Sequence, residues 1–318
     1  MTKDSLRIVY MGTPDFAVES LRALVEGGYN VVAVITMPDK PIGRHGNQLQ
    51  PSPVKQYAME HGLYIMQPSN LKDPAFVEEL RSLKADLQIV VAFRMLPQVV
   101  WQMPPLGTFN AHASLLPKYR GAAPINWAVI NGEKETGVTT FFLKHEIDTG
   151  DIIQQVKIGI SDTDNVEVVH DKLMKLSGQL VIETVNNIIA GTVKSIPQDD
   201  IKDIIPTPAP KIFRDTCRIC WNQPSKKAHD FIRGLSPYPA AWTTLNGKSV
   251  KITEAFPMTD IQSQAEPGTI ATDQKTYLHV ATSDGWLDIR TLQIEGKKRM
   301  ATADLLRGMK IEDGSCFE

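Results

Sequence analysis

The first half of the chain alternates short apolar runs with amphipathic stretches. Apolar runs of strand length lie at residues 6–11, 31–35, 63–66, 87–93 and 108–111. Stretches with apolar positions three and four residues apart, as on one face of a helix, lie at residues 16–25, 52–61 and 73–83. Strands that alternate with helices predict a parallel, doubly wound sheet, whose ligand site lies at the carboxyl ends of its strands.

The pattern changes in the middle of the chain. Two apolar runs, residues 138–143 and 152–160, follow one another without a helix between them, which predicts an antiparallel addition to the sheet. A long amphipathic helix is expected over residues 165–189, and the alternating prolines of residues 206–210 favour an extended linker. We therefore expect a first domain over residues 1–190, a linker over 191–210 and a second domain over 211–318.

The second domain has mostly the pattern of short strands. One helix is expected at residues 225–235, and the clearest hairpin turn of the chain is Asn246-Gly247. Short strands at regular spacing are expected at residues 241–245, 249–255, 268–272, 277–281 and 287–294. The expected fold class is therefore α/β, with a doubly wound, mostly parallel, Rossmann-like sheet followed by a small OB-like β-barrel.

The composition is that of an ordinary globular protein, with 42% hydrophobic and 22% charged residues in a chain of 318 residues. A net charge of −2 argues against a surface that binds nucleic acid by being basic throughout. The chain has neither a signal-peptide pattern nor an apolar run long enough to span a bilayer. Its three cysteines are too few for a disulfide framework, so we expect a reducing, cytoplasmic location.

Two motifs resemble a nucleotide-binding turn and a metal-binding cysteine pair, but both are incomplete. The turn Gly12-Thr13-Pro14-Asp15 follows the first strand but has one glycine, where a dinucleotide site needs Gly-x-Gly-x-x-Gly, so we reject a nicotinamide cofactor. Cys217 and Cys220 form a single pair without a second ligand pair at matching spacing. We expect buried structural cysteines and no metal.

The candidate chemistry begins at the end of a predicted interior strand. Alternation places Asn110 and His112 on one face of that strand. An amide can donate to a developing oxyanion, and an imidazole titrates near neutrality, although each residue alone is more typical of a turn or a buried core. A second polar cluster contains Asp148, which either orients His112 or caps its own loop. Together the three residues suggest acyl-type transfer.

The surrounding motif resembles a known family. Residues 110–121 read Asn-x-His-x-Ser-Leu-Leu-Pro-x-Tyr-Arg-Gly, and residues 148–150 read Asp-Thr-Gly, a combination similar to the signature of folate-dependent formyltransferases. The resemblance implies that Asn110, His112 and Asp148 form the catalytic set and that the co-substrate is 10-formyltetrahydrofolate. It also implies a folate contact made by Ser114, Leu115, Leu116 and Pro117.

The resemblance extends over both domains. Residues 12–17, 38–44, 51–55 and 231–242 resemble the branch of the family that acts on methionyl-tRNA. This implies formylation of the α-amino group of initiator methionyl-tRNA for translation initiation, by a monomer without a membrane partner. The long loop with Lys40 and Arg44 is then expected to contact the acceptor stem. Further phosphate contacts are expected from four C-terminal lysines, Lys226, Lys227, Lys248 and Lys251.

Two alternatives stay open at this point. One is a formyltransferase that acts on an amino sugar, against which the loop around Arg44 and the C-terminal barrel argue. The other is a catalytically inactive tRNA-binding module, against which the complete set of Asn110, His112 and Asp148 argues. In the expected reaction the amine attacks the formyl carbon, Asn110 donates to the oxyanion, and His112 takes or relays the proton. Whether His112 or Asp148 is the formal base is left open.

Overall fold

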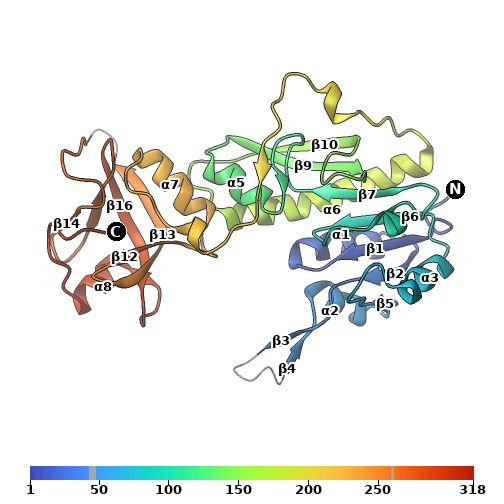
Figure 1. Cartoon of the computed structure of the whole chain (residues 1–318), viewed down its shortest axis with the longest axis horizontal. Coiled ribbons are helices and arrows are strands. Elements are labelled where there is room, and N and C mark those ends of the chain that lie inside the picture. The colour runs from blue at the N-terminus through green and yellow to red at the C-terminus, as the bar shows by residue number, and fades with distance from the viewer. Residues whose placement is uncertain (43–47, 259–260) are drawn as a thin grey trace. The chain divides into compact units, whose positions relative to one another are not determined.

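The structure, a computed structural model, describes residues 1–42, 48–258 and 261–318. The chain divides into two compact units (Figure 1). The first unit comprises residues 1–121, 136–158 and 170–208, and the second comprises residues 122–135, 159–169 and 209–318. Among the described helices, none has the length and apolar character needed to cross a membrane.

The first unit is built on a seven-stranded sheet in the order β10-β9-β7-β6-β1-β2-β5. Its strands are β1 (Ile8–Gly12), β2 (Val31–Ile35), β5 (Ile65–Met66), β6 (Leu87–Val91), β7 (Thr108–His112), β9 (Glu135–Phe142) and β10 (Ile152–Gly159). Neighbouring strands from β5 to β7 are parallel, whereas β9 runs antiparallel to β7. The predicted mostly parallel sheet with an antiparallel addition is confirmed.

Helices cover both faces of this sheet (Figure 1). Alternate residues of β1 point to opposite sides: Val9 and Met11 share a core with Leu80, while the hydroxyl of Tyr10 donates to the carbonyl of Ala17. Strands buried on both faces read as continuous apolar runs, which is the pattern that the sequence shows. The helices are α1 (Asp15–Glu26), α2 (Pro53–Glu60), α3 (Pro74–Ser82), α4 (Gln98–Trp101) and α6 (Val166–Ala190).

The loop between β2 and α2 contains a hairpin that the sequence pattern does not indicate. Strand β3 (Lys40–Ile42) pairs antiparallel with β4 (Gln48–Gln50), and Arg44 lies outside the described residues. At the base of the hairpin, Asp39 accepts hydrogen bonds from Lys55 of α2 at 2.6 Å and from Gln67 at 2.8 Å. These two donors, Lys55 above all, hold the pKa of Asp39 below its ordinary value. The hairpin is therefore fastened to the sheet unit at its base.

The second unit contains a six-stranded antiparallel sheet. Its strands are β12 (Ala241–Leu245), β13 (Lys248–Met258), β14 (Ile270–Thr272), β15 (Leu278–Ala281), β16 (Trp286–Ile294) and β17 (Met300–Ala301). Asn246 and Gly247 connect β12 and β13 with φ angles of 50° and 75°, as a tight hairpin turn requires. The C-terminal residues bond to both edges: Glu318 pairs with Thr244, and Phe317 donates to Gly268. The sheet is thereby closed into a small barrel.

Three helices complete the second unit. They are α5 (Pro124–Ile130), α7 (Ser225–Gly234) and α8 (Thr302–Gly308). The amide of Asn126 in α5 donates to the carbonyl of Gly234 at the end of α7, at 2.8 Å. Short elements elsewhere in the chain are β8 (Arg120–Gly121), β11 (Pro208–Ala209) and the 3-10 turns η1 (Gln198–Asp200) and η2 (Asp215–Cys217).

Candidate active site

Strand β7 carries two of the three predicted catalytic residues to the carboxyl edge of the parallel sheet. Asn110 and His112 are two residues apart in a regular strand and so share one face. The side-chain amide oxygen of Asn110 is buried and has no hydrogen-bond partner among the described residues. A buried polar atom without a partner costs about 1–3 kcal/mol, so a bound molecule that donates a hydrogen bond to this oxygen would recover that free energy.

The imidazole of His112 is buried and held in one tautomer. Its Nε2 lies 2.8 Å from the carbonyl oxygen of Tyr119. Because a carbonyl oxygen only accepts hydrogen bonds, Nε2 carries the hydrogen, and in the neutral ring Nδ1 is left as the basic nitrogen. The edge of the ring also meets Phe141, with centroids 6.5 Å apart at 83°. These contacts fix the orientation of the ring, and Nδ1 is the nitrogen that can accept a proton.

Asp148 lies on the Nδ1 side of the imidazole ring. Its Oδ2 lies 3.9 Å from Nδ1 of His112, and both side chains are about nine-tenths buried. The separation is too long for a hydrogen bond but short enough for strong attraction once the imidazole is charged. The same oxygen accepts a hydrogen bond from the backbone N–H of Gly121 at 2.9 Å. Asp148 itself adopts a φ of 55°, a backbone conformation that its surroundings must hold.

The loop between β9 and β10, residues 143–151, is called the Asp148 loop below. It is held by a buried glutamine, Gln198, which the sequence pattern does not indicate. The amide of Gln198 donates to the carbonyls of Asp148 and Gly150, at 2.8 and 2.9 Å. Its oxygen accepts from Nε and Nη2 of Arg120, at 3.1 and 2.7 Å. Every hydrogen-bonding group of this amide is therefore satisfied, and it ties the Asp148 loop to the segment that supplies Gly121. No sequence signal marks Gln198, because its partners lie about 50 residues or more away along the chain.

The residues of the expected folate contact lie mostly inside the protein. The hydroxyl of Ser114 donates to the carbonyl of Lys118, and the backbone N–H of Leu116 donates to the hydroxyl of Thr139. Leu116 and Pro117 are buried and Leu115 is half-buried. In this structure these side chains shape the loop that follows His112, so their contact with folate stays a prediction.

A cavity of about 890 Å³ lies in the first unit, beside the Asp148 loop. Its walls come from the segments that follow β5 and β6 and from His145, three residues before Asp148; they include Ser69, Lys72, Arg94, Leu96, Trp101 and His145. The guanidinium of Arg94 donates to the carbonyls of Pro68 and Ser69, and burial lowers its pKa. Openings at the carboxyl ends of parallel strands are where ligands bind in sheets of this class.

The described part of the chain holds no group of three histidine, cysteine or acidic side chains that could bind a metal ion. Cys217 is buried, and its thiol donates to the carbonyl of Phe213 at 3.2 Å. Burial raises the pKa of that thiol, which lowers its reactivity. Cys220 is exposed and unbonded to another cysteine. The expectation of a buried cysteine is therefore confirmed for Cys217 and wrong for Cys220.

The doubly wound sheet, the polar set at its edge and the appended barrel define a formyltransferase, and the comparisons agree. The formyl transferase family model matches residues 6–185, and the model of the formyl transferase C-terminal domain matches residues 211–310. The methionyl-tRNA formyltransferase of Bacteroides fragilis is 64% identical over 319 residues, which cover 98% of each chain. The chain belongs to the methionyl-tRNA formyltransferase family.

Solved structures share the fold at lower identity. The N-formyltransferase from Helicobacter canadensis, in complex with folinic acid and dTDP-3-aminofucose, matches 93% of this chain with a TM-score of 0.68 and 20% identity, over its whole length. HypX from Aquifex aeolicus, in complex with tetrahydrofolic acid, matches 97% of this chain with a TM-score of 0.63 and 20% identity. The chain spans about half the length of HypX, at 49%.

Proposed function

We propose that this enzyme transfers the formyl group of 10-formyltetrahydrofolate to the α-amino group of methionyl-tRNA, producing formylmethionyl-tRNA in the cytoplasm, where translation begins. The observation that carries the chemistry is the arrangement of Asn110, His112 and Asp148: an amide on the same strand face as the imidazole, a basic nitrogen and a carboxylate 3.9 Å from it. The acceptor is supported by 64% identity to a methionyl-tRNA formyltransferase over nearly the whole of both chains.

Each of the three residues has its own role in the proposed reaction. As the amine nitrogen attacks the formyl carbon, the carbonyl oxygen becomes an oxyanion, to which the amide of Asn110 donates. Nδ1 of His112 accepts the proton that the amine loses, and the negative charge of Asp148 stabilises the imidazolium. The bond from carbon to N10 then breaks, and the proton passes from His112 to N10 of the departing tetrahydrofolate.

The large cavity beside the Asp148 loop suits the folate. Trp101 and Leu96 offer apolar surface to its ring systems, and Lys72 and Arg94 offer positive charge to its glutamate carboxylates. We propose that the loop of Ser114 to Pro117 contributes mainly by fixing the backbone beside His112.

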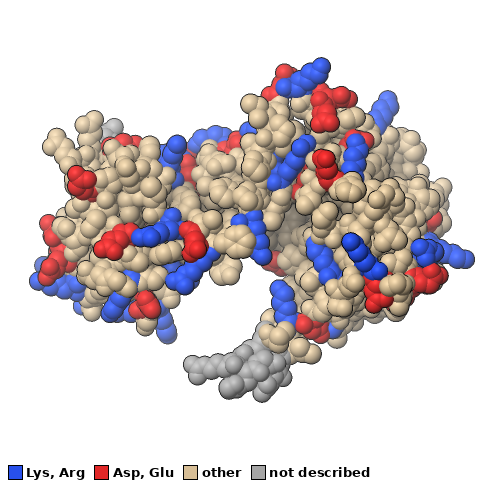
Figure 2. All heavy atoms as spheres, viewed as in Figure 1, with Lys and Arg blue, Asp and Glu red and all other residues tan. Residues whose placement is uncertain are grey.

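For the tRNA, we propose contacts from the β3–β4 hairpin, with Lys40 and Arg44 as its cations. Figure 2 shows lysine and arginine interleaved with acidic side chains on the face in view, so local clusters rather than a uniform basic surface would hold the RNA. Of the C-terminal lysines, Lys226 is paired with Asp230 at 2.6 Å and is the weakest candidate.

The test offers the enzyme labelled 10-formyltetrahydrofolate with methionyl-tRNA, with uncharged tRNA or with a dTDP-linked amino sugar. We expect label on methionyl-tRNA alone. Transfer to the sugar without transfer to methionyl-tRNA would assign the chain to the sugar branch instead. Binding of tRNA without transfer to either acceptor would identify an inactive binding module.

A further inference from the structure

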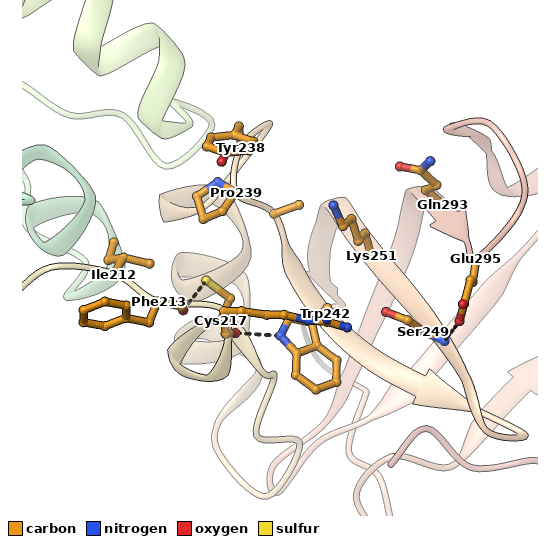
Figure 3. A pocket seen from close by; sticks show the side chains of 12 residues that line it. Ile212, Phe213, Cys217, Tyr238, Pro239, Trp242, Ser249, Lys251, Gln293 and Glu295 are labelled. Atoms are coloured by element: carbon orange, nitrogen blue, oxygen red, sulfur yellow. Dashed lines mark hydrogen bonds between the residues drawn. The ribbon is translucent and has the colours of Figure 1, made fainter. Parts of the chain in front are cut away.

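The second unit has a cavity of about 570 Å³ that contains none of the residues discussed so far as catalytic. It lies between the segment of residues 212–217, the turn at residues 238–240 and strands β12, β13 and β16 (Figure 3). Its lining includes three aromatic rings, two cations and an amide: Phe213, Tyr238, Trp242, Arg214, Lys251 and Gln293. That mixture differs from the apolar core of the barrel beneath it.

Two of the aromatic rings are exposed without a structural reason. Tyr238 is 81% exposed and Phe213 is 60% exposed, although large aromatic side chains normally bury most of their surface. Tyr238 stands between Pro237 and Pro239, whose rings restrict the backbone, so its position is held at little entropic cost. Figure 3 shows the two rings at different edges of the pocket, with Tyr238 beside Pro239 and Phe213 beside Ile212. Flat apolar surfaces presented in this way are suited to stacking.

Positive charge lies close to two of the three rings, Trp242 and Phe213. The guanidinium carbons of Arg214 and Arg218 each lie 5.6 Å from the ring centroid of Trp242, and Lys211 Nζ lies 5.5 Å from that of Phe213. Lys251 rises from β13 in the middle of the pocket (Figure 3). Within the described ranges, none of these four cations has a carboxylate at ion-pair distance. They are exposed and free to meet an anion.

The remaining polar groups are consistent with a ligand that carries one negative charge and a hydrogen-bonding edge. The one acidic residue of the lining, Glu295, accepts a hydrogen bond from the backbone N–H of Ser249 at 3.2 Å. The amide nitrogen of Gln293 donates to the carbonyl of Lys297. Among the described residues, its amide oxygen and the hydroxyl of Ser249 have no hydrogen-bond partner, so both can pair with the edge of a base.

We propose that this cavity is a nucleotide subsite, which takes one unstacked nucleotide of the tRNA. The base stacks on Tyr238, and a neighbouring phosphate lies between Arg214 and Lys251. A nucleotide is the ligand that requires a flat apolar surface and a cation within one small cavity, and small barrels of this class bind oligonucleotides. The inference rests on the proposed function only in that the acceptor is an RNA.

The test measures equilibrium binding of uncharged tRNA together with kcat and KM for formylation. Tyr238→Ala removes the stacking surface, so we expect binding to weaken about 5- to 100-fold and KM for methionyl-tRNA to rise equally, with kcat unchanged. Tyr238→Phe keeps the ring and is expected to restore binding. Arg214→Ala is expected to lower the slope of log affinity against log salt by about one.

Two matched controls lie elsewhere in the same barrel. Tyr277 is a partly exposed tyrosine that stacks on His279, and Arg290 is an exposed arginine paired with Asp288. Tyr277→Ala and Arg290→Ala are expected to leave tRNA binding within about twofold. Wild-type binding in both Tyr238→Ala and Arg214→Ala, or an equal loss in the controls, would overturn the subsite. Binding of tRNA that depends on Tyr238 in a protein that formylates no methionyl-tRNA would overturn the proposed function and leave the subsite standing.

Discussion

Replacing Asp148 by asparagine isolates the effect of its charge on His112. The two charged groups would be 3.9 Å apart in a mostly buried setting. With an effective dielectric constant of about 20, unit charges at that separation attract by about 4 kcal/mol. An asparagine keeps an oxygen that can accept from the N–H of Gly121, so the loop can remain in place while the attraction is lost. Because 1.36 kcal/mol corresponds to a factor of ten, we expect a fall of about 10²- to 10³-fold in the rate of transfer.

Single-turnover transfer from labelled 10-formyltetrahydrofolate to methionyl-tRNA measures this step directly. The loss is expected in the rate at saturation, with the affinity for either substrate little changed, since the charge acts when the proton reaches His112. Asp151→Asn is the matched control, because Asp151 lies in the same loop but pairs with the exposed Lys144 at 2.6 Å. That variant is expected to stay within about twofold of the wild-type rate.

Two results would refute this reasoning. A rate within about threefold of wild type in a folded Asp148→Asn protein would mean that the carboxylate does not stabilise charge on His112. An equal loss in Asp151→Asn would mean that the loop, rather than the charge, had been disturbed. Thermal unfolding of both variants distinguishes a folded protein from a damaged one.

Three further changes test the remaining parts of the site. Asn110→Ala removes the proposed oxyanion donor, so kcat is expected to fall about 10²- to 10³-fold, and near-wild-type turnover would exclude that role. Gln198→Leu leaves two loop carbonyls without their donor, so we expect kcat to fall with KM values unchanged and the unfolding temperature to drop; a drop in stability alone would mean that Gln198 does not position the loop. Arg44→Glu is expected to raise KM for methionyl-tRNA and leave folate binding unchanged, and an unaltered KM would remove this loop from the interface.

The larger elements could be predicted from the sequence because their hydrophobic periods are long enough to be read. The strands of the central sheet are apolar runs buried on both faces, and α6 repeats its apolar positions over many turns. Strands β3 and β4 have three residues each, which is too short to show an alternation. Helix α5 has seven residues and depends on packing against α7, which no local pattern records.

The sequence predicts the positions of some residues of the candidate site but not of others. Asn110 and His112 share a face because the period of a strand is two, and that follows from sequence alone. The approach of Asp148 to His112 does not follow from the sequence. The strand register places the end of β9 opposite the beginning of β7, where Phe142 pairs with Phe109. His112 is at the far end of β7, across from Thr139. The loop after β9 therefore has to fold back to bring its carboxylate to the imidazole.

The features that fold the loop back are a close backbone contact, a positive φ and hydrogen bonds from other segments of the chain, and no hydrophobic pattern reports them. Gly150 packs so closely that a Cβ there would lie 1.6 Å from the carbonyl oxygen of Phe142, so only glycine fits. Asp148 needs its positive φ, and Gln198 binds the carbonyls on either side of Thr149. Gly121 then fixes the carboxylate itself. The Asp-Thr-Gly sequence that is ordinary turn chemistry in isolation here places a carboxylate 3.9 Å from the imidazole of His112, and a glutamine from another segment of the chain holds its carbonyls.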